Sequence, residues 1–363
     1  MSRSIPTLAL LALTAVTTGA AAAHAARSEP GQRFPRAQLA RFATHVARRD
    51  GLNRRALLRV LKHARVQPKI IDDMNRPAER VLQWWQYRQI FLTDRRIAEG
   101  VEFWREHRDS LERVSAEQGV PPQYIVAILG AETYYGRITG SYRVLDALAT
   151  LAFDYPPRAH YFRGELEQFL VLTQRQKIDP LAARGSYAGA MGPLQFMPSA
   201  YLRYGIDDDE DGQTDLFNDW DDVFASVANY LHECGWQAGG PVVADVRIDP
   251  GATFQINPSN LTLDQTIDAL NAQGVRVDTA VPGDTRVVLL LAQQQDGPAY
   301  RVGFNNFHAL TRYNYSALYA MAVDELARAI ALRFNPANPG AMPTVAPTAK
   351  SGGNADRSSR SAE

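Results

Sequence analysis

Apolar residues recur every three or four positions along the first half of the chain, which is the spacing of an α-helix. Between Phe34 and about Gln118 this pattern predicts a region built of helices. The dipeptide Pro121-Pro122 interrupts it. Because proline is tolerated in the first helical turn, a new helix is expected to begin there and to run to about Tyr134. Further helices are predicted at residues 158–176, 198–204 and 220–234.

The pattern changes after Gly239-Gly240. Residues 241–256 and 286–303 carry short runs of Val, Leu and Phe that are typical of strands, and Leu263–Gln273 between them has helical spacing. Helical spacing returns at Ser316–Arg333. From Asn335 onward Pro, Ala, Ser, Gly and Lys dominate without periodicity, which indicates a disordered tail.

The predicted elements place the chain in the mainly α class with one small α+β segment. We expect a leader, an N-terminal helical region, a central helical core, the α+β segment, a helix that returns to the core, and the tail. Their predicted bounds are 1–25, 26–118, 119–239, 240–311, 312–334 and 335–363.

The leader has the features of a cleavable secretory signal peptide. Arg3 precedes a short apolar run, Leu8–Val16, and Ala23-His24-Ala25 fits a small-residue cleavage site. The apolar run is too short to span a bilayer, although an uncleaved anchor is the alternative. The only cysteine is Cys234, so an internal disulfide is excluded and no lipid-bearing cysteine stands at the cleavage site. We therefore expect a soluble periplasmic protein without a stable membrane anchor.

Charge is balanced over the 363 residues, with 39 basic and 39 acidic side chains, so the global field does not favour nucleic acid as a partner. The basic residues are nevertheless concentrated in one segment. Residues 33–69 contain many Lys and Arg and a single acidic residue, Asp50. This segment is either a solvated helix face or a surface that meets an anionic polymer such as peptidoglycan.

One carboxylate lies on the apolar face of a predicted helix. Ile125, Ile128 and Leu129 form the stripe, and Glu132 continues it. Burial, together with the negative end of the helix dipole, is expected to raise the pKa of Glu132, as a glycosidase acid requires. The alternative is a buried structural glutamate paired with an arginine such as Arg137 or Arg143.

Five separated blocks resemble the lytic murein transglycosylase B family, glycoside hydrolase family 103. They occur in the order of the family and span roughly Pro77 to Ala331. The blocks are GAETYYG at 130–136, YRVLDALATLAF at 142–153, GSYAGAMG with QFMPS at 185–199, SVANY at 226–230 and RYNYS at 312–316.

The resemblance implies a lysozyme-like helical catalytic core and a set of site residues. Glu132 would be the single acid and base. The residues implied to hold the sugar are Ser186, Gln195, Tyr230, Tyr313, Asn314 and Tyr319. Glu165 and Glu167 also lie in a family-like helix but are interpreted as solvated or structural.

The family's reaction implies peptidoglycan glycan strands as substrate. Glu132 would protonate the bond between N-acetylmuramic acid and N-acetylglucosamine, and the substrate's acetamido group would stabilise the resulting centre. Glu132 would then take the proton of the 6-hydroxyl, which closes a 1,6-anhydro ring. No cofactor is required for this chemistry. A hydrolytic muramidase and a non-catalytic peptidoglycan-binding scaffold are the alternatives.

An acidic segment resembles the opening of an EF-hand loop. Asp207, Asp209 and Asp211 stand at positions one, three and five, and Gly212 stands at six. Gln213 would offer its backbone carbonyl. Asn218 replaces the usual glutamate at position twelve, and the resemblance implies that Asp221 closes the site. We expect a structural Ca²⁺ ion, with a solvated acidic turn as the alternative.

Overall fold

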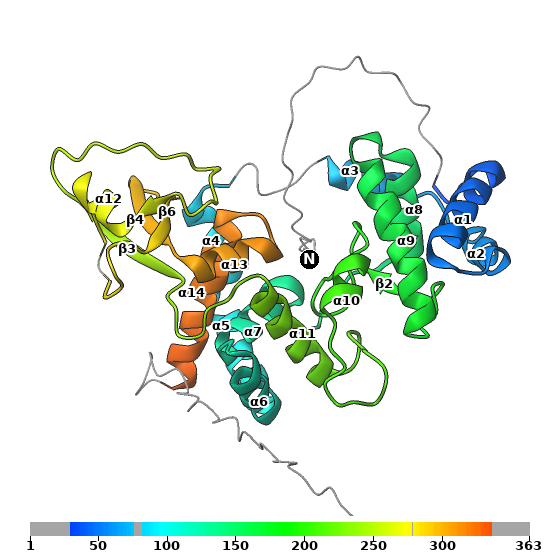
Figure 1. Ribbon diagram of the computed structural model, residues 1–363, viewed down its shortest axis with the longest axis horizontal. Coiled ribbons are helices and arrows are strands. Elements are labelled where there is room, and N and C mark those ends of the chain that lie inside the picture. The colour runs from blue at the N-terminus through cyan, green and yellow to red at the C-terminus, as the bar shows by residue number, and fades with distance from the viewer. Residues whose placement is uncertain (1–29, 76–81, 278, 336–363) are drawn as a thin grey trace, which may run out of the picture.

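The computed structural model describes residues 30–75, 82–277 and 279–335. The predicted leader and almost all of the predicted tail lie outside these residues. The chain is mainly α with a small sheet at one side, which confirms the predicted fold class (Figure 1). Within the described parts, no helix has the length and apolar character needed to cross a membrane.

The described helices follow one another along the chain and are interrupted by a two-stranded sheet, β1-β2, and by a five-stranded sheet formed by β3 to β7. The α-helices are α1 Arg36–Asp50, α2 Arg54–Leu61, α3 Pro68–Met74, α4 Trp84–Phe91, α5 Asp94–Glu106, α6 Arg108–Gln118, α7 Pro122–Thr133, α8 Val144–Asp154, α9 Ala159–Arg175, α10 Pro198–Tyr204, α11 Trp220–Glu233, α12 Ile267–Ala272, α13 Asn305–Tyr313 and α14 Ala317–Phe334. The strands are β1 Tyr142–Arg143, β2 Arg184–Gly185, β3 Val243–Ile248, β4 Gln265–Thr266, β5 Val275–Val277, β6 Arg286–Gln293 and β7 Pro298–Gly303.

The segment 26–118 was predicted as one region, but its described helices pack against two different parts of the molecule. Helix α3 packs against α8, and Phe34 and Phe42 place their rings edge-on against Phe153 of α8. Helices α4 and α5 instead pack against α14, and α6 packs against α11. In Figure 1, α1, α2 and α3 lie at the right, near α8 and α9, whereas α4, α5 and α6 lie at the centre and left, near α7, α11 and α14. Sequence spacing predicts helices but not which partners they pack against.

Helix α7 lies at the centre of the core. It packs against α5, α6, α11 and α14, and the run Ile125–Leu129 has no exposed surface. A helix that is apolar on nearly all sides is stable only when neighbours cover every side. The predicted start at Pro122 is confirmed. The helix ends at Thr133 because Tyr134 and Tyr135 both adopt positive φ angles.

The sheet has the strand order β4-β6-β7-β3-β5, and all neighbouring strands are antiparallel. It lies within the segment predicted as α+β and has its own small apolar cluster, which includes Ile267, Leu270 and Val302. The single helix expected at Leu263–Gln273 is shorter, because Thr266 ends β4 and caps α12 by accepting a hydrogen bond from Ala269 N.

Candidate active site

Glu132 lies in the last turn of α7 and lines a cavity of about 240 Å³. The cavity walls come from α7, α9, α10, α11 and α13 and from the loop that precedes α10. Its lining residues are Glu132, Tyr161, Glu165, Ala190, Gln195, Phe196, Met197, Ser199, Ala200, Tyr230 and Tyr313. Residues from five distant parts of the sequence therefore meet around one half-buried carboxylate.

The Glu132 carboxylate accepts a hydrogen bond from the Tyr319 hydroxyl, with an O–O distance of 2.6 Å. Burial raises the pKa of Tyr319 well above its ordinary value, and the nearby charge of Glu132 raises it further. Tyr319 therefore remains a proton donor to Glu132. The arginines that could have made Glu132 a structural ion pair are engaged elsewhere, since Arg137 pairs with Glu99 and Arg143 with Asp146.

The backbone beyond Glu132 is held in a strained turn. Tyr134 and Tyr135 have φ angles of 55° and 60°, a region that costs free energy for residues with side chains. The Thr133 hydroxyl fixes the turn, because it donates to Pro193 O at 2.9 Å and accepts from Gly136 N at 3.0 Å. The Tyr135 hydroxyl donates to Arg96 O at 2.7 Å. These contacts fix the end of α7 and thereby the direction of Glu132.

The segment Gly185–Met197, here called the buried loop, contributes Ala190, Gln195, Phe196 and Met197 to the cavity lining. Gln195 stands in it with a φ angle of 53°, and its Nε2 atom donates to Thr139 O and Gly192 O, both at 3.0 Å. Because two carbonyls occupy the amide nitrogen, the orientation of this amide is fixed. The Oε1 atom is buried and has no hydrogen-bond partner among the described residues. Gln195 therefore presents a free acceptor at the cavity.

Three tyrosines form an aromatic wall beside Glu132. The Tyr313 ring lies nearly parallel to that of Tyr319, with centroids 6.5 Å apart, and 5.0 Å from that of Tyr230. The Tyr313 hydroxyl donates to Leu194 O at 2.7 Å, and the Tyr230 hydroxyl donates to Arg312 O. Burial raises the pKa of both phenols. Their hydroxyls are thus committed to the backbone, and their rings are left to contact a ligand.

The two remaining residues implied for sugar binding differ in their surroundings. The Ser186 hydroxyl is buried and accepts from Ala188 N at 3.2 Å and Ala190 N at 3.0 Å, so it shapes the buried loop and does not line the cavity. Asn314 is also buried, but both polar atoms of its amide lack a partner in the part of the chain that the structure describes. Asn314 therefore keeps unpaired polar atoms, but like Ser186 it does not belong to the cavity lining.

Sequence reasoning missed one cluster at the cavity, formed by Tyr161, Glu165 and Ser199. The Glu165 carboxylate accepts from Ser199 Oγ at 2.7 Å and from Ser199 N at 3.0 Å. Burial raises the pKa of Glu165, although hydrogen bonds from Ser199 and Tyr161 oppose this effect. Tyr161 and Glu165 are four residues apart on α9, so the helical spacing that revealed Glu132 could have indicated them as well.

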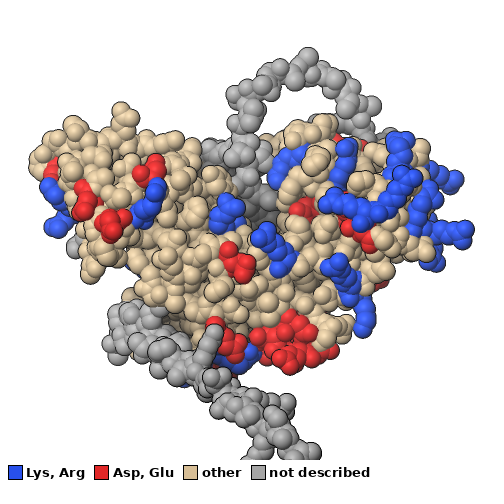
Figure 2. Space-filling view, in the orientation of Figure 1, with Lys and Arg blue, Asp and Glu red and all other residues tan. Residues whose placement is uncertain are grey.

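The segment Asp207–Gln213, here called the acidic loop, brings three carboxylates together. Oxygen atoms of Asp207, Asp209 and Asp211 lie within 4.8 Å of one another, an arrangement of hard oxygen ligands that suits Ca²⁺. The Gly212 amide donates to Asp207 Oδ2 at 2.9 Å and the Gln213 amide to Asp211 Oδ1 at 2.7 Å. In Figure 2 acidic side chains gather on the lower edge, where Figure 1 shows the connection between α10 and α11.

The expected closing residue of this loop, Asp221, lies apart from the three carboxylates. It accepts a hydrogen bond from the Ser110 hydroxyl, and Arg113 is 3.7 Å away. The neighbouring Asp222 is buried and accepts from Asp208 N and Asp215 N, both at 2.7 Å. Burial raises the pKa of Asp222 to about 6. Asp222 therefore anchors both ends of the loop in the structure described here.

Comparison with known proteins identifies the family of this chain. A family model for the transglycosylase SLT domain matches residues 35–328. The chain is 38% identical over 310 residues to the membrane-bound lytic murein transglycosylase B of Escherichia coli K12, which covers 82% of this chain and 83% of that protein.

Two solved structures are also similar over most of the chain. The catenated lytic transglycosylase SltB1 of Pseudomonas aeruginosa has a TM-score of 0.77 and 44% identity, covering 82% of this chain and 98% of that one. The Escherichia coli lytic transglycosylase Slt35 in complex with calcium has a TM-score of 0.75 and 38% identity, covering 83% and 94%. The chain therefore belongs to the lytic murein transglycosylase B family and is an enzyme that acts on peptidoglycan.

Proposed function

We propose that Glu132 is the single acid and base of this enzyme. As an acid it protonates the oxygen that links N-acetylmuramic acid to N-acetylglucosamine, and the C–O bond breaks. The acetamido group of the muramic sugar stabilises the carbon that is left. Glu132, now a carboxylate, accepts the proton of the 6-hydroxyl while that oxygen bonds to the carbon, so a 1,6-anhydro ring forms without water.

The observation that carries this proposal is the position of Glu132 in the cavity lining, at the end of α7. Its hydrogen bond to the Tyr319 hydroxyl orients the carboxylate without neutralising it. Glu165 is the second carboxylate of the cavity, but Ser199 occupies both of its oxygens. A hydrolase that activates water would need a free second carboxylate, which disfavours the muramidase alternative.

The amides of Gln195 and Asn314 are the proposed polar contacts of the sugar: Gln195 lines the cavity, whereas Asn314 is buried outside the lining and would have to become accessible when the sugar binds. Gln195 Oε1 can accept a hydrogen bond from the acetamido N–H, because its Nε2 atom is already committed to two carbonyls. Asn314 offers both a donor and an acceptor. A buried polar group without a partner costs free energy, so a ligand that satisfies these groups gains affinity. The rings of Tyr230 and Tyr313 would pack against the sugar.

The test is a digest of purified peptidoglycan read by mass spectrometry. We expect the wild-type protein and the Glu165→Gln variant to release muropeptides that end in 1,6-anhydro-N-acetylmuramic acid, and the Glu132→Gln variant to release none. Products one water heavier would identify a hydrolase and overturn the proposed mechanism. Activity that survives in Glu132→Gln would show that another residue is the acid.

We also propose a structural Ca²⁺ ion in the acidic loop. The carboxylates of Asp207, Asp209 and Asp211 with the carbonyl of Gln213 would hold it, and Asp221 would close the site after leaving Ser110. Support comes from the clustered carboxylates and from the calcium complex of the similar Escherichia coli enzyme. The ion would brace the connection between α10 and α11 and take no part in the chemistry.

We propose that the protein is exported and acts in the periplasm after cleavage between Ala25 and Ala26. The sequence of the leader and the peptidoglycan substrate of the family support this location. Intact mass measurement of protein from a periplasmic fraction tests it. A mature chain that begins at Ala26 is expected, and a full-length chain held in the membrane fraction would contradict it.

A further inference from the structure

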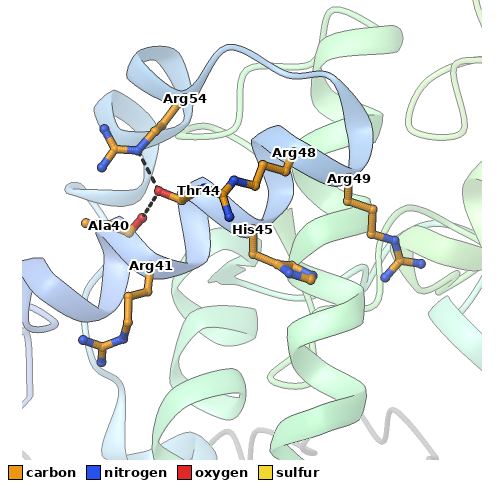
Figure 3. A pocket seen from close by; sticks show the side chains of 7 residues that line it. All are labelled: Ala40, Arg41, Thr44, His45, Arg48, Arg49 and Arg54. Atoms are coloured by element: carbon orange, nitrogen blue, oxygen red, sulfur yellow. Dashed lines mark hydrogen bonds between the residues drawn. The ribbon is translucent and has the colours of Figure 1, made fainter.

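A groove on the outer face of α1 and α2 is lined mainly by arginine side chains. Its volume is about 660 Å³. We call it the basic groove, and its lining residues are Ala40, Arg41, Thr44, His45, Arg48, Arg49 and Arg54 (Figure 3). Figure 2 shows that Lys and Arg side chains dominate this end of the molecule. The groove lies apart from the catalytic cavity and has no role in the mechanism above.

The arrangement of the cations follows from helix geometry. Arg41, His45, Arg48 and Arg49 come from one face of α1, since they are spaced by three, four or one residues. Arg54 comes from α2, and its Nε atom donates to Thr44 Oγ1 at 2.7 Å, which holds its guanidinium across the groove. Like charges so close together destabilise a helix unless an anion lies among them.

Few acidic groups of the protein neutralise the groove. Arg49 and His45 both reach Glu167 of α9, at 3.2 Å and 3.6 Å. Arg41, Arg48 and Arg54 are exposed, and none of them has an ion pair with any residue in the ranges that the structure describes. At least three guanidinium groups are therefore available to an external anion.

The groove and the catalytic cavity lie on opposite sides of one helix. Glu165 of α9 lines the cavity, and Glu167, two residues further on, faces the basic groove. Two residues of a helix differ in direction by about 200°, and the helix is about 10 Å across. A polymer cut in the cavity therefore has neighbouring parts of the same network within reach of the groove.

We propose that the basic groove binds the carboxylates of peptidoglycan stem peptides, on a part of the network next to the strand being cut. This inference rests on the proposed function, because it takes the same polymer as ligand. Guanidinium groups match the planar geometry of carboxylates and bind them in a bidentate manner. Several carboxylates along a peptide-bearing strand complement several arginines along α1 and α2. Such a site would keep the enzyme on cross-linked material between cuts.

The experiment measures co-sedimentation with peptidoglycan in the Glu132→Gln background, so that no cutting occurs. The test variant adds Arg41→Gln, Arg48→Gln and Arg54→Gln. A matched control adds Arg175→Gln, Lys177→Gln and Arg247→Gln, which removes three exposed cations from other surfaces. Thermal denaturation of each variant establishes that it is folded.

We expect the groove variant to bind peptide-bearing peptidoglycan about tenfold more weakly than its parent at low salt, and the control to bind like the parent. The difference should shrink as salt rises. It should vanish on peptidoglycan whose peptide carboxylates have been converted to amides with a carbodiimide and an amine. Equal loss on the amidated peptidoglycan, or no loss at all, would overturn the proposal.

A membrane is the competing partner for a cationic surface. Vesicles of phosphatidylglycerol and phosphatidylcholine distinguish it. If the groove variant loses vesicle binding while its peptidoglycan binding is unchanged, the partner is a lipid surface and the proposal is wrong. Failure of the catalytic proposal would be visible separately, because the digest detects products and this assay detects only binding.

Discussion

Two loops flank α10, and the protein holds them in different ways. The buried loop, at Gly185–Met197, is fixed by the hydroxyls of Ser186, Thr133 and Tyr313, each of which bonds to its backbone. The acidic loop, at Asp207–Gln213, is largely exposed and is fixed by its own carboxylates, which accept from its own amides. The buried loop is thus ordered by contacts with the surrounding protein, and the acidic loop by hydrogen bonds between its own carboxylates and amides.

This difference predicts which changes in sequence or solution should disturb each loop. The buried loop carries Gln195 to the cavity and has space for no additional atom at several positions. The acidic loop keeps three like charges within 4.8 Å, which is unfavourable unless a cation balances them. Changes of side-chain volume should therefore disturb the first loop, and changes of ionic composition should disturb the second.

The largest effect is expected from adding one methyl group to each loop. A Cβ atom at Gly192 would lie 2.2 Å from the backbone oxygen of Leu216, and the φ angle there is 64°. Gly192→Ala should lower the free energy of unfolding by about 3 kcal/mol or more, from the sum of left-handed strain and overpacking. Gly212→Ala has a similar φ angle of 87° but meets no atom within 4 Å, so it should cost only about 1 kcal/mol.

Urea denaturation of Gly192→Ala, Gly212→Ala and the wild-type protein in the same buffer measures the two losses in free energy of unfolding. Equal losses would mean that the buried loop can move away from Leu216 and is less rigid than its contacts indicate.

The next largest effect is expected from Ca²⁺. An ion that binds only the folded state stabilises it by about 2.7 kcal/mol when its concentration is a hundred times its Kd. We therefore expect Ca²⁺ to raise the Tm of the wild-type protein and a chelator to lower it again. Asp209→Asn should abolish the response, and Asp221→Asn shows whether Asp221 joins the site. If Ca²⁺ does not change the Tm, the acidic loop is a solvated turn and the calcium proposal is wrong.

A smaller loss of stability is expected when the Thr133 hydroxyl, which bonds the end of α7 to the buried loop, is removed. Thr133→Val keeps the shape but leaves Pro193 O and Gly136 N without their partner. An unsatisfied buried group costs about 1–3 kcal/mol, so the free energy of unfolding should fall by about 2 kcal/mol. Activity should fall further than stability predicts, because the same turn aims Glu132. Thr133→Ser, which keeps the hydroxyl, should restore activity, and failure to do so would count against this role.

The smallest effect is a pH dependence of stability at Glu165 of α9, which accepts hydrogen bonds from Ser199 of α10. Burial raises the pKa of Glu165, so the folded state keeps this proton to a higher pH than the unfolded chain does. The resulting stabilisation is complete below the ordinary pKa of about 4.5 and is lost as the pH rises through the folded value. Glu165→Gln cannot ionise, so the wild-type stability relative to this variant should decrease with rising pH.

Denaturation curves at several pH values measure how the stability difference between the wild-type protein and Glu165→Gln changes with pH. Glu233→Gln, at an exposed carboxylate, serves as the control and should show no such trend. A flat difference for Glu165→Gln as well would show that Ser199 and Tyr161 compensate fully for its burial.

Local pattern was sufficient for much of the fold. Helical spacing predicted α7 and α9–α11, and the prolines at 121 and 122 predicted where α7 begins. The short strands β1, β2, β4 and β5 were missed, because two or three residues carry no periodicity and form a strand only against a partner. The helices between Phe34 and Gln118 were predicted, but their division between two sites of packing was not.

The same holds for the candidate site: local sequence pattern indicated single residues but not their contacts with distant ones. The sequence alone indicated that Glu132 lies in a core or lines a cavity, because a carboxylate on an apolar helix face must point into one or the other, and Glu132 does line a cavity. It also indicated that Asp207, Asp209 and Asp211 cluster, because their spacing is local. Only the tertiary structure decided that Glu165 shares the cavity with Glu132, that Ser186 shapes a turn, and that Asp221 faces Ser110. Such facts depend on contacts between residues far apart in the chain, and no local pattern records them.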